Sequence, residues 1–144
     1  MSTVLRTLLV GRRRHPLQRP LLAGLAVVLF FLSLSAYATG LATVSGGVVW
    51  VPGHAALIGV AAGFGVGFAR GGLLFAWLAS YASLLGFFAY GAAIEAAEGD
   101  LVERVGSLVR VDALVFFGVE AVLFGTVAFV LGSVGGWGVR YITD

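Results

Sequence analysis

A single carboxylate in an apolar run is the residue best placed to do chemistry in this sequence. Glu120 stands in the middle of residues 115–125, which read VFFGVEAVLFG. Ionising a carboxylate is costly in apolar surroundings, so a neutral, protonated acid is one option for this side chain. Ionisable residues inside membrane segments are candidates for functional sites by default. Glu120 is therefore the first candidate.

Other polar side chains fall at a similar depth in the apolar stretches around it. We expect them to face an outward pocket together with Glu120 and to form an ion or proton site. Alternatively, Glu120 forms a hydrogen bond with Ser83 or Tyr90 and only ties two helices together, while His54 is an interfacial residue without a partner. The groups are Tyr37, His54, Ser83, Tyr90 and Glu95.

Catalytic and cofactor motifs are missing from the sequence. It contains no G-x-S-x-G, no H-E-x-x-H and no phosphate-binding loop. With no Cys and two His, it offers no thiol chemistry and little basis for a zinc or haem site. The dispersed net charge of +2 does not suggest nucleic acid as a partner. We expect a non-enzymatic protein without a cofactor or a metal.

The composition places these residues in a membrane. The 144 residues are 60% hydrophobic and 11% charged, against about 45–50% and about 25% in soluble domains. A helix that crosses a bilayer needs about 20 apolar residues. The sequence thus predicts an all-α integral membrane protein with a four-transmembrane-helix bundle. Its spans are 21–42, 52–69, 72–94 and 113–134.

Segments at both ends flank the predicted transmembrane domain of residues 21–134. Residues 1–20 form a basic N-terminal segment and residues 135–144 a C-terminal tail. If both lie on one side with the turn at Arg70, that side holds seven of the nine Arg. Positive charge marks the cytoplasmic side, so we predict a multi-pass cell-membrane protein with both termini cytoplasmic.

The basic N-terminal segment has two interpretations. Arg12, Arg13 and Arg14 are expected to lie near anionic headgroups of the bilayer. The simpler interpretation is that they only orient the chain.

A short amphipathic helix is predicted on the outer surface, between the third and fourth spans. Asp100 is a suitable N-cap, with Glu103 three residues later as in a capping box. The apolar residues that follow share one helical face, which suits a helix lying flat at the interface. They are Leu101, Val105, Leu108 and Val109. At the start of the second span, Pro52 is predicted to occupy the first helical position.

Small residues recur at helical spacing in two spans. Such residues let helix backbones approach closely in a membrane. Glu120 lies about 200° around the helix from Gly118, so two opposite faces of the fourth span need cover, which a four-helix monomer provides poorly. This pattern predicts an oligomer. The packing residues are Ala55, Gly59, Gly63 and Gly67 in the second span, and Gly118, Gly125 and Gly132 in the fourth.

The third span also divides into two faces. We expect its small and polar residues to face the bundle and its bulky residues to meet lipid. The bulky residues are Trp77, Tyr81, Leu84 and Phe88.

Two functions remain open from the sequence. The first is a non-enzymatic subunit of a homo-oligomer or of a larger membrane complex. The second is a small proton- or cation-coupled transporter or channel that uses Glu120. Replacing Glu120 by Gln distinguishes them, because a structural hydrogen bond survives this change and a proton relay does not.

Overall fold

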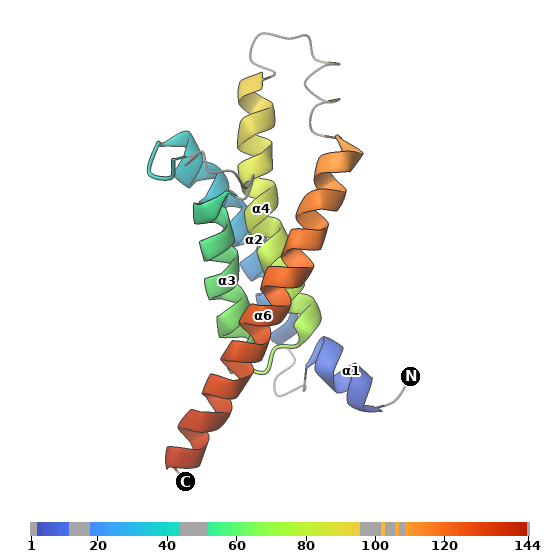
Figure 1. Cartoon of the computed structure of the whole chain (residues 1–144), viewed down its shortest axis with the longest axis vertical. Helices are drawn as coiled ribbons and strands as arrows, with labels where there is room; N and C mark the ends of the chain where they lie inside the picture. Colours follow the sequence, from blue (N-terminus) through green and yellow to red (C-terminus); the bar gives the residue numbers. More distant parts are fainter. Residues whose placement is uncertain are drawn as a thin grey trace.

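The described part of the chain is entirely helical. The computed structural model describes residues 3–11, 18–43, 52–95, 102, 106 and 109–143, and these contain no strand. Figure 1 shows the long helices side by side, with α1 and the C-terminal end of α6 at the same end of the bundle. The helices are α1 (Thr3–Val10), α2 (Gln18–Ala38), α3 (Gly53–Phe68), α4 (Leu73–Glu95) and α6 (Val111–Thr143).

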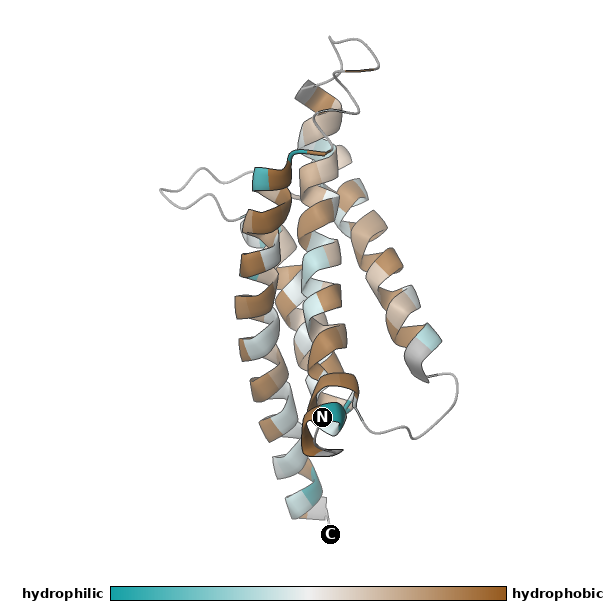
Figure 2. Cartoon of the chain, turned by 90° about the vertical axis from the view of Figure 1, so that its right-hand side faces the viewer, coloured by the Kyte–Doolittle hydropathy of each residue, from teal (hydrophilic) through white to brown (hydrophobic). Residues whose placement is uncertain are grey.

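Three of these helices are long and apolar enough to cross a membrane. They contain the apolar segments Pro20–Ala38, Leu73–Ile94 and Val111–Ile142. In Figure 2, apolar residues follow the helices along their length and the most hydrophilic ones lie near helix ends. α3 is apolar but has only 16 residues, about 24 Å of helix against a hydrocarbon core of about 30 Å. The structure thus supports a membrane-embedded helical protein with three candidate spans and one shorter apolar helix.

Two predicted boundaries differ from the observed ones, at the end of α2 and at the start of α3. α2 ends at Ala38 rather than at residue 42, because Gly40 takes a left-handed φ of 74° and its N–H bonds the Tyr37 carbonyl. Pro52 is the N-cap of α3 rather than its first helical residue, with φ −70° and ψ 92°. Its extended backbone lets the chain enter the helix at Gly53.

The last helix is longer than expected. α6 continues to Thr143, so the predicted tail of residues 135–144 is helical up to that residue. The predicted surface helix at residues 100–109 lies outside the described residues except at positions 102, 106 and 109.

α4 is the central helix of the bundle. It packs against α2, α3 and α6, whereas α2 has its main contacts with α4. Leu84 is only 1% exposed, and the Trp77 Nε1 donates to the Thr126 Oγ1 at 2.9 Å. The Tyr81 hydroxyl donates to a carbonyl of α6. The expectation that the bulky face of the third span meets lipid is wrong for Trp77, Tyr81 and Leu84, because the first two bond α6 and the third is buried.

Glycines of α3 bring this helix close to its neighbours. An added Cβ at Gly59 would lie 3.0 Å from the Ser80 Cα of α4, and one at Gly63 would lie 3.1 Å from the Ala128 Cβ of α6. At Gly67 an added Cβ would overlap the Phe129 carbonyl. α3 therefore fits into the groove between α4 and α6 of the same chain.

The glycines of α6 differ from one another. A Cβ at Gly125 would lie 3.0 Å from the Trp77 Cδ1, and one at Gly132 would overlap the Phe64 carbonyl of α3. At Gly118 the nearest atom would be the Tyr81 Cε2, at 3.9 Å. Of the three glycines predicted to pack, Gly125 and Gly132 thus make close contacts with neighbouring helices, and Gly118 does not.

Candidate functional site

Glu120 is buried by its own chain. Its exposed fraction is 7%, and its Oε2 has no hydrogen-bond partner in the part of the chain that the structure describes. On α6 it stands between Phe117 and Ala121, which belong to the apolar core cluster with Tyr37 and Leu84. The helices of a single chain therefore cover this side chain, and the predicted oligomer stays a prediction.

Contacts between helices fix the depth of Glu120 in the bundle. Trp77 bonds Thr126, and α4 and α6 run in opposite directions, as Figure 1 shows. Ser83 lies six residues after Trp77 on α4, and Glu120 lies six residues before Thr126 on α6. In antiparallel helices both steps lead the same way, by about 9 Å. Ser83 and Glu120 therefore share one level.

The contact between α3 and α6 gives the same depth for Glu120. α3 and α6 run in the same direction (Figure 1) and meet where Gly63 faces Ala128. Ala55 lies eight residues before Gly63 on α3, and Glu120 lies eight residues before Ala128 on α6. Both steps cover about 12 Å in the same direction. Ser83 of α4 and Ala55 of α3 thus lie at the level of the Glu120 carboxyl group.

Ala55 connects the polar groups at this level through its backbone. Its N–H is among the first of α3, which have no partner within the helix, and the Pro52 N-cap supplies no side-chain bond. The Tyr37 hydroxyl accepts this N–H at 3.3 Å. The Ser83 Oγ donates to the Ala55 carbonyl at 2.7 Å. Side chains from α2 and α4 therefore hold the start of α3 inside the bundle.

Tyr90 supports this arrangement through its ring. The centroid of the Tyr90 ring lies 5.9 Å from that of the Tyr37 ring, and the ring planes are inclined by 29°. The Phe87 ring also packs on Tyr37, with 4.9 Å between the two ring centroids. These contacts keep the Tyr37 hydroxyl directed at α3. Tyr90 is therefore a neighbour of the polar group that caps α3.

The remaining predicted residues are not brought into the site. His54 is exposed on the first turn of α3, and the side chain of Glu95 lies outside the described residues. The Ser83 hydroxyl, which was expected to bond Glu120 if that residue only tied helices together, donates to Ala55 instead. The structure thus places Tyr37 and Ser83 in contact with the start of α3, Tyr90 against Tyr37, and Glu120 at the level of Ser83.

Sequence reasoning missed two features of this region. The backbone of Ala55 carries the polar contacts, and no residue type signals this. Ser33 of α2 is fully buried, and its Oγ has no hydrogen-bond partner among the described residues. An isolated serine in an apolar stretch gives no sign of which helix it will face.

The arrangement has a limited chemistry. A carboxyl group can take up or release one proton, and a carboxylate with hydroxyl and carbonyl oxygens suits a hard cation. Groups of three or more His, Cys, Asp or Glu able to hold a metal ion are absent from the described residues. The site is therefore suited to a proton or to a single weakly held cation.

Comparisons with known proteins give no family for this chain. No protein-family model matches the sequence, and neither the curated proteins nor the solved structures contain a significant match.

Proposed function

We propose that the protein is a non-enzymatic membrane protein in which Glu120 exchanges a proton or binds a cation within the bilayer. One observation carries this proposal: the carboxyl group is buried, and its Oε2 has no hydrogen-bond partner among the described residues. The Ser83 hydroxyl and the first turn of α3, which bond each other, lie at the same level of the bundle. The function is that of a small proton- or cation-coupled transporter or channel.

The energetics favour a functional acid over a structural one. Leaving a buried polar atom without a partner costs about 1–3 kcal/mol, and the described residues supply no hydrogen bond to the Glu120 Oε2. Buried unsatisfied groups in folded proteins call for a specific reason. Exchange of a proton or a cation is such a reason, because the incoming species supplies the missing partner.

The proposed topology is a four-helix bundle with both termini cytoplasmic. α3 serves as a short fourth membrane helix, since the Tyr37 hydroxyl accepts the Ala55 N–H of its first turn and the Ser83 hydroxyl donates to the Ala55 carbonyl inside the bundle. Positive charge gathers on the side of α1 and the end of α6. Cysteines introduced at Ser2 and Thr143 should resist an impermeant thiol reagent in intact cells. A cysteine at Ser107 should react, and labelling at both ends would overturn this orientation.

Assembly into a homo-oligomer or a larger complex is the competing proposal. Its main argument was that Glu120 needs cover from a neighbour, and the chain supplies that cover itself. A single copy is therefore sufficient for the proposed site. Native mass spectrometry after mild extraction measures the number of copies and any further subunit directly.

A hydrophobic carbodiimide tests the protonated state of Glu120. This reagent modifies protonated carboxyl groups in apolar surroundings, so the parent protein should gain one adduct by intact mass and Glu120→Gln none. Asp112→Asn is the matched control, because Asp112 is exposed and paired with Arg110 at 3.1 Å, and this variant should keep the adduct. An adduct that persists in Glu120→Gln would contradict the assignment.

Flux measurements test the role itself. In liposomes, the parent protein should carry a pH-dependent flux that Glu120→Gln abolishes, since a relay needs a group that changes charge. Glu120→Leu should also abolish flux while keeping or raising thermal stability, because it removes a buried polar group that has an unpaired oxygen. Absence of flux in the parent, or loss of stability in Glu120→Leu, would favour a structural acid.

A further inference from the structure

The polar side chains at the level of Glu120 are engaged with α3. The Ser83 hydroxyl donates to the Ala55 carbonyl at 2.7 Å, and the Tyr37 hydroxyl accepts the Ala55 N–H at 3.3 Å. The Oε2 of Glu120 has no hydrogen-bond partner in the part of the chain that the structure describes. Beyond its own carboxyl group, the site therefore offers an incoming species few oxygen atoms that are not already bonded.

The helices beside Glu120 also keep their backbone carbonyls for themselves. α6 is helical from Val111 to Thr143 and α4 from Leu73 to Glu95, so the carbonyls near Glu120 accept bonds within their own helix. In membrane transporters, cations are coordinated by carbonyls that unwound helices set free. A hard cation such as Ca²⁺ takes about 6–8 oxygen ligands. An uninterrupted α6 does not supply such a set.

The start of α3 has the wrong polarity for a cation. Ala55 is the third residue of α3, and it belongs to the same apolar cluster as Phe117 and Ala121, which stand on either side of Glu120. The N-terminus of a helix carries N–H groups and about half a positive charge. Such an end repels a cation, whereas it lowers the cost of an ionised carboxylate. The start of α3 therefore favours release of a proton from Glu120 over binding of a metal ion.

The helices that pack on α6 offer Glu120 no counter-charge. They are α3 and α4, and neither contains Arg or Lys. His54 is exposed on α3, and Glu95 is the last residue of α4, about 18 Å along the helix from the level of Glu120. Their other titratable side chains are Tyr81 and Tyr90. On α6 itself, Asp112 is about 12 Å away, so the pH dependence of the site should be that of a single acid.

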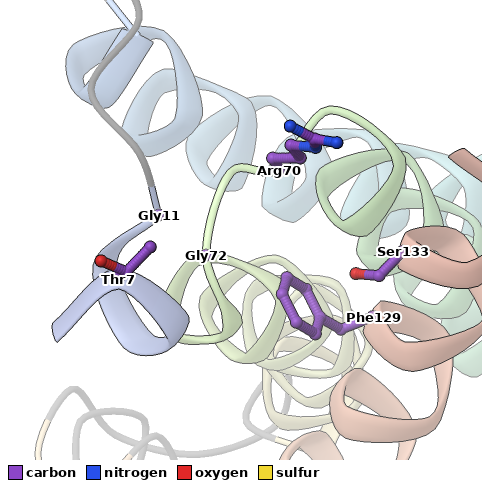
Figure 3. A pocket seen from close by; sticks show the side chains of 6 residues that line it. All are labelled: Thr7, Gly11, Arg70, Gly72, Phe129 and Ser133. Carbon is purple, nitrogen blue, oxygen red and sulfur yellow. The ribbon is translucent and has the colours of Figure 1, made fainter. Parts of the chain in front are cut away.

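A pocket that the structure describes lies far from Glu120. Its volume is about 340 Å³, and α1, the turn between α3 and α4, and α6 form it (Figure 3). A Cβ added at Gly72 of this turn would lie 2.5 Å from the Gly11 nitrogen, so α1 docks closely there. Ser133, on the wall formed by α6, lies about 20 Å along the helix from Glu120. This pocket is too distant to hold a hydrated cation against the carboxyl group.

We propose that the species exchanged at Glu120 is a proton and not a metal cation. This inference rests on the proposed function of Glu120 and names its substrate. A proton needs only one carboxyl oxygen, which the site provides, whereas a cation needs further ligands, which the neighbouring groups do not provide. On release, the O–H bond of the carboxyl group breaks and the electron pair stays on the oxygen. On uptake, the same bond forms again.

Competition for carbodiimide modification tests this inference. The rate of adduct formation at Glu120 is measured by intact mass at constant pH and ionic strength, with chloride salts of choline, Na⁺, K⁺, Li⁺, Mg²⁺ or Ca²⁺. Every metal salt should give the rate found with choline. Raising the pH beyond the midpoint should slow the reaction by about tenfold per unit, as expected for one acid. A metal ion that slows the reaction relative to choline would overturn the proposal, because a bound ion protects the carboxylate.

Flux in liposomes gives a second measurement. A pH gradient should drive proton flux when choline is the only other cation, and flux that requires a metal ion would overturn the proposal. Failure of this inference differs from failure of the proposed function. A parent protein that forms no adduct at Glu120 at any pH would refute both, whereas protection by a metal ion of an adduct that does form would refute only the choice of a proton.

Discussion

The contact between α3 and α6 at Gly132 allows a sharp test of the packing. In Gly132→Ala, the new Cβ would overlap the Phe64 carbonyl oxygen and lie 3.0 Å from the Phe68 nitrogen. Both are backbone atoms of α3, so no side-chain rotation relieves the overlap. Ordinary contacts between carbon atoms are about 3.5–4.0 Å. The two helices must therefore separate by about 1 Å to admit one methyl group.

The expected cost follows from two opposing terms. Overpacking costs about 1–3 kcal/mol, and the upper end applies here because rigid backbone is displaced. Alanine recovers about 1 kcal/mol relative to glycine in a helix. The net loss is about 2 kcal/mol, which lowers the Tm by about 6 °C for a chain of this size.

Gly138→Ala is the matched control in the same helix. An added Cβ at Gly138 meets nothing within 4 Å, so only the helix-propensity term of about 1 kcal/mol remains and the Tm should rise by about 3 °C. Thermal unfolding of both variants in the same detergent measures the two shifts. Equal shifts, or a stabilised Gly132→Ala, would refute the close approach of α3 to α6.

Three further outcomes follow from the described contacts. Tyr37→Phe leaves the Ala55 N–H unpaired inside the bundle and should cost about 1–3 kcal/mol in thermal unfolding; an unchanged Tm would show that another group caps α3. Trp77→Phe removes the bond to Thr126 and should cost about 0.6 kcal/mol, the usual worth of a hydrogen bond between membrane helices; a loss beyond about 2 kcal/mol would mean that ring packing dominates. Gly72→Ala should release α1, seen as faster hydrogen exchange in that helix, while exchange in the rest of the bundle stays slow; unchanged exchange in α1 would contradict the tight docking.

Composition and spacing alone predicted the class of the protein and most of its helices. Long apolar runs without charge have few alternatives to helices, because backbone polar groups in lipid need partners within the segment. The same logic singled out Glu120, since its burial in an apolar run follows from its neighbours in sequence. Helix ends were less certain: Gly40 ended α2 early, while the glycines near residue 135 did not end α6.

Which faces meet was decided only by the tertiary structure. The bulky face of α4 looks lipid-facing by residue type, yet Trp77 and Tyr81 bond α6 because α4 lies in the centre of the bundle. Likewise, Ser83 bonds the backbone of Ala55 and not Glu120. Periodicity gives the faces of a single helix, whereas the order, rotation and register of helices depend on how separate segments fit together.

Glu120 and the pocket lined by Thr7, Arg70 and Phe129 show the same division. Residue type and depth identified Glu120 from the sequence, but its unpartnered oxygen became evident only when the surrounding helices were in place. The pocket at Arg70 had no sequence signal, because its walls come from segments near residues 10, 70 and 130. Local sequence determines what a residue is able to do; long-range packing determines what it meets, because each helix–helix contact joins residues far apart in the chain.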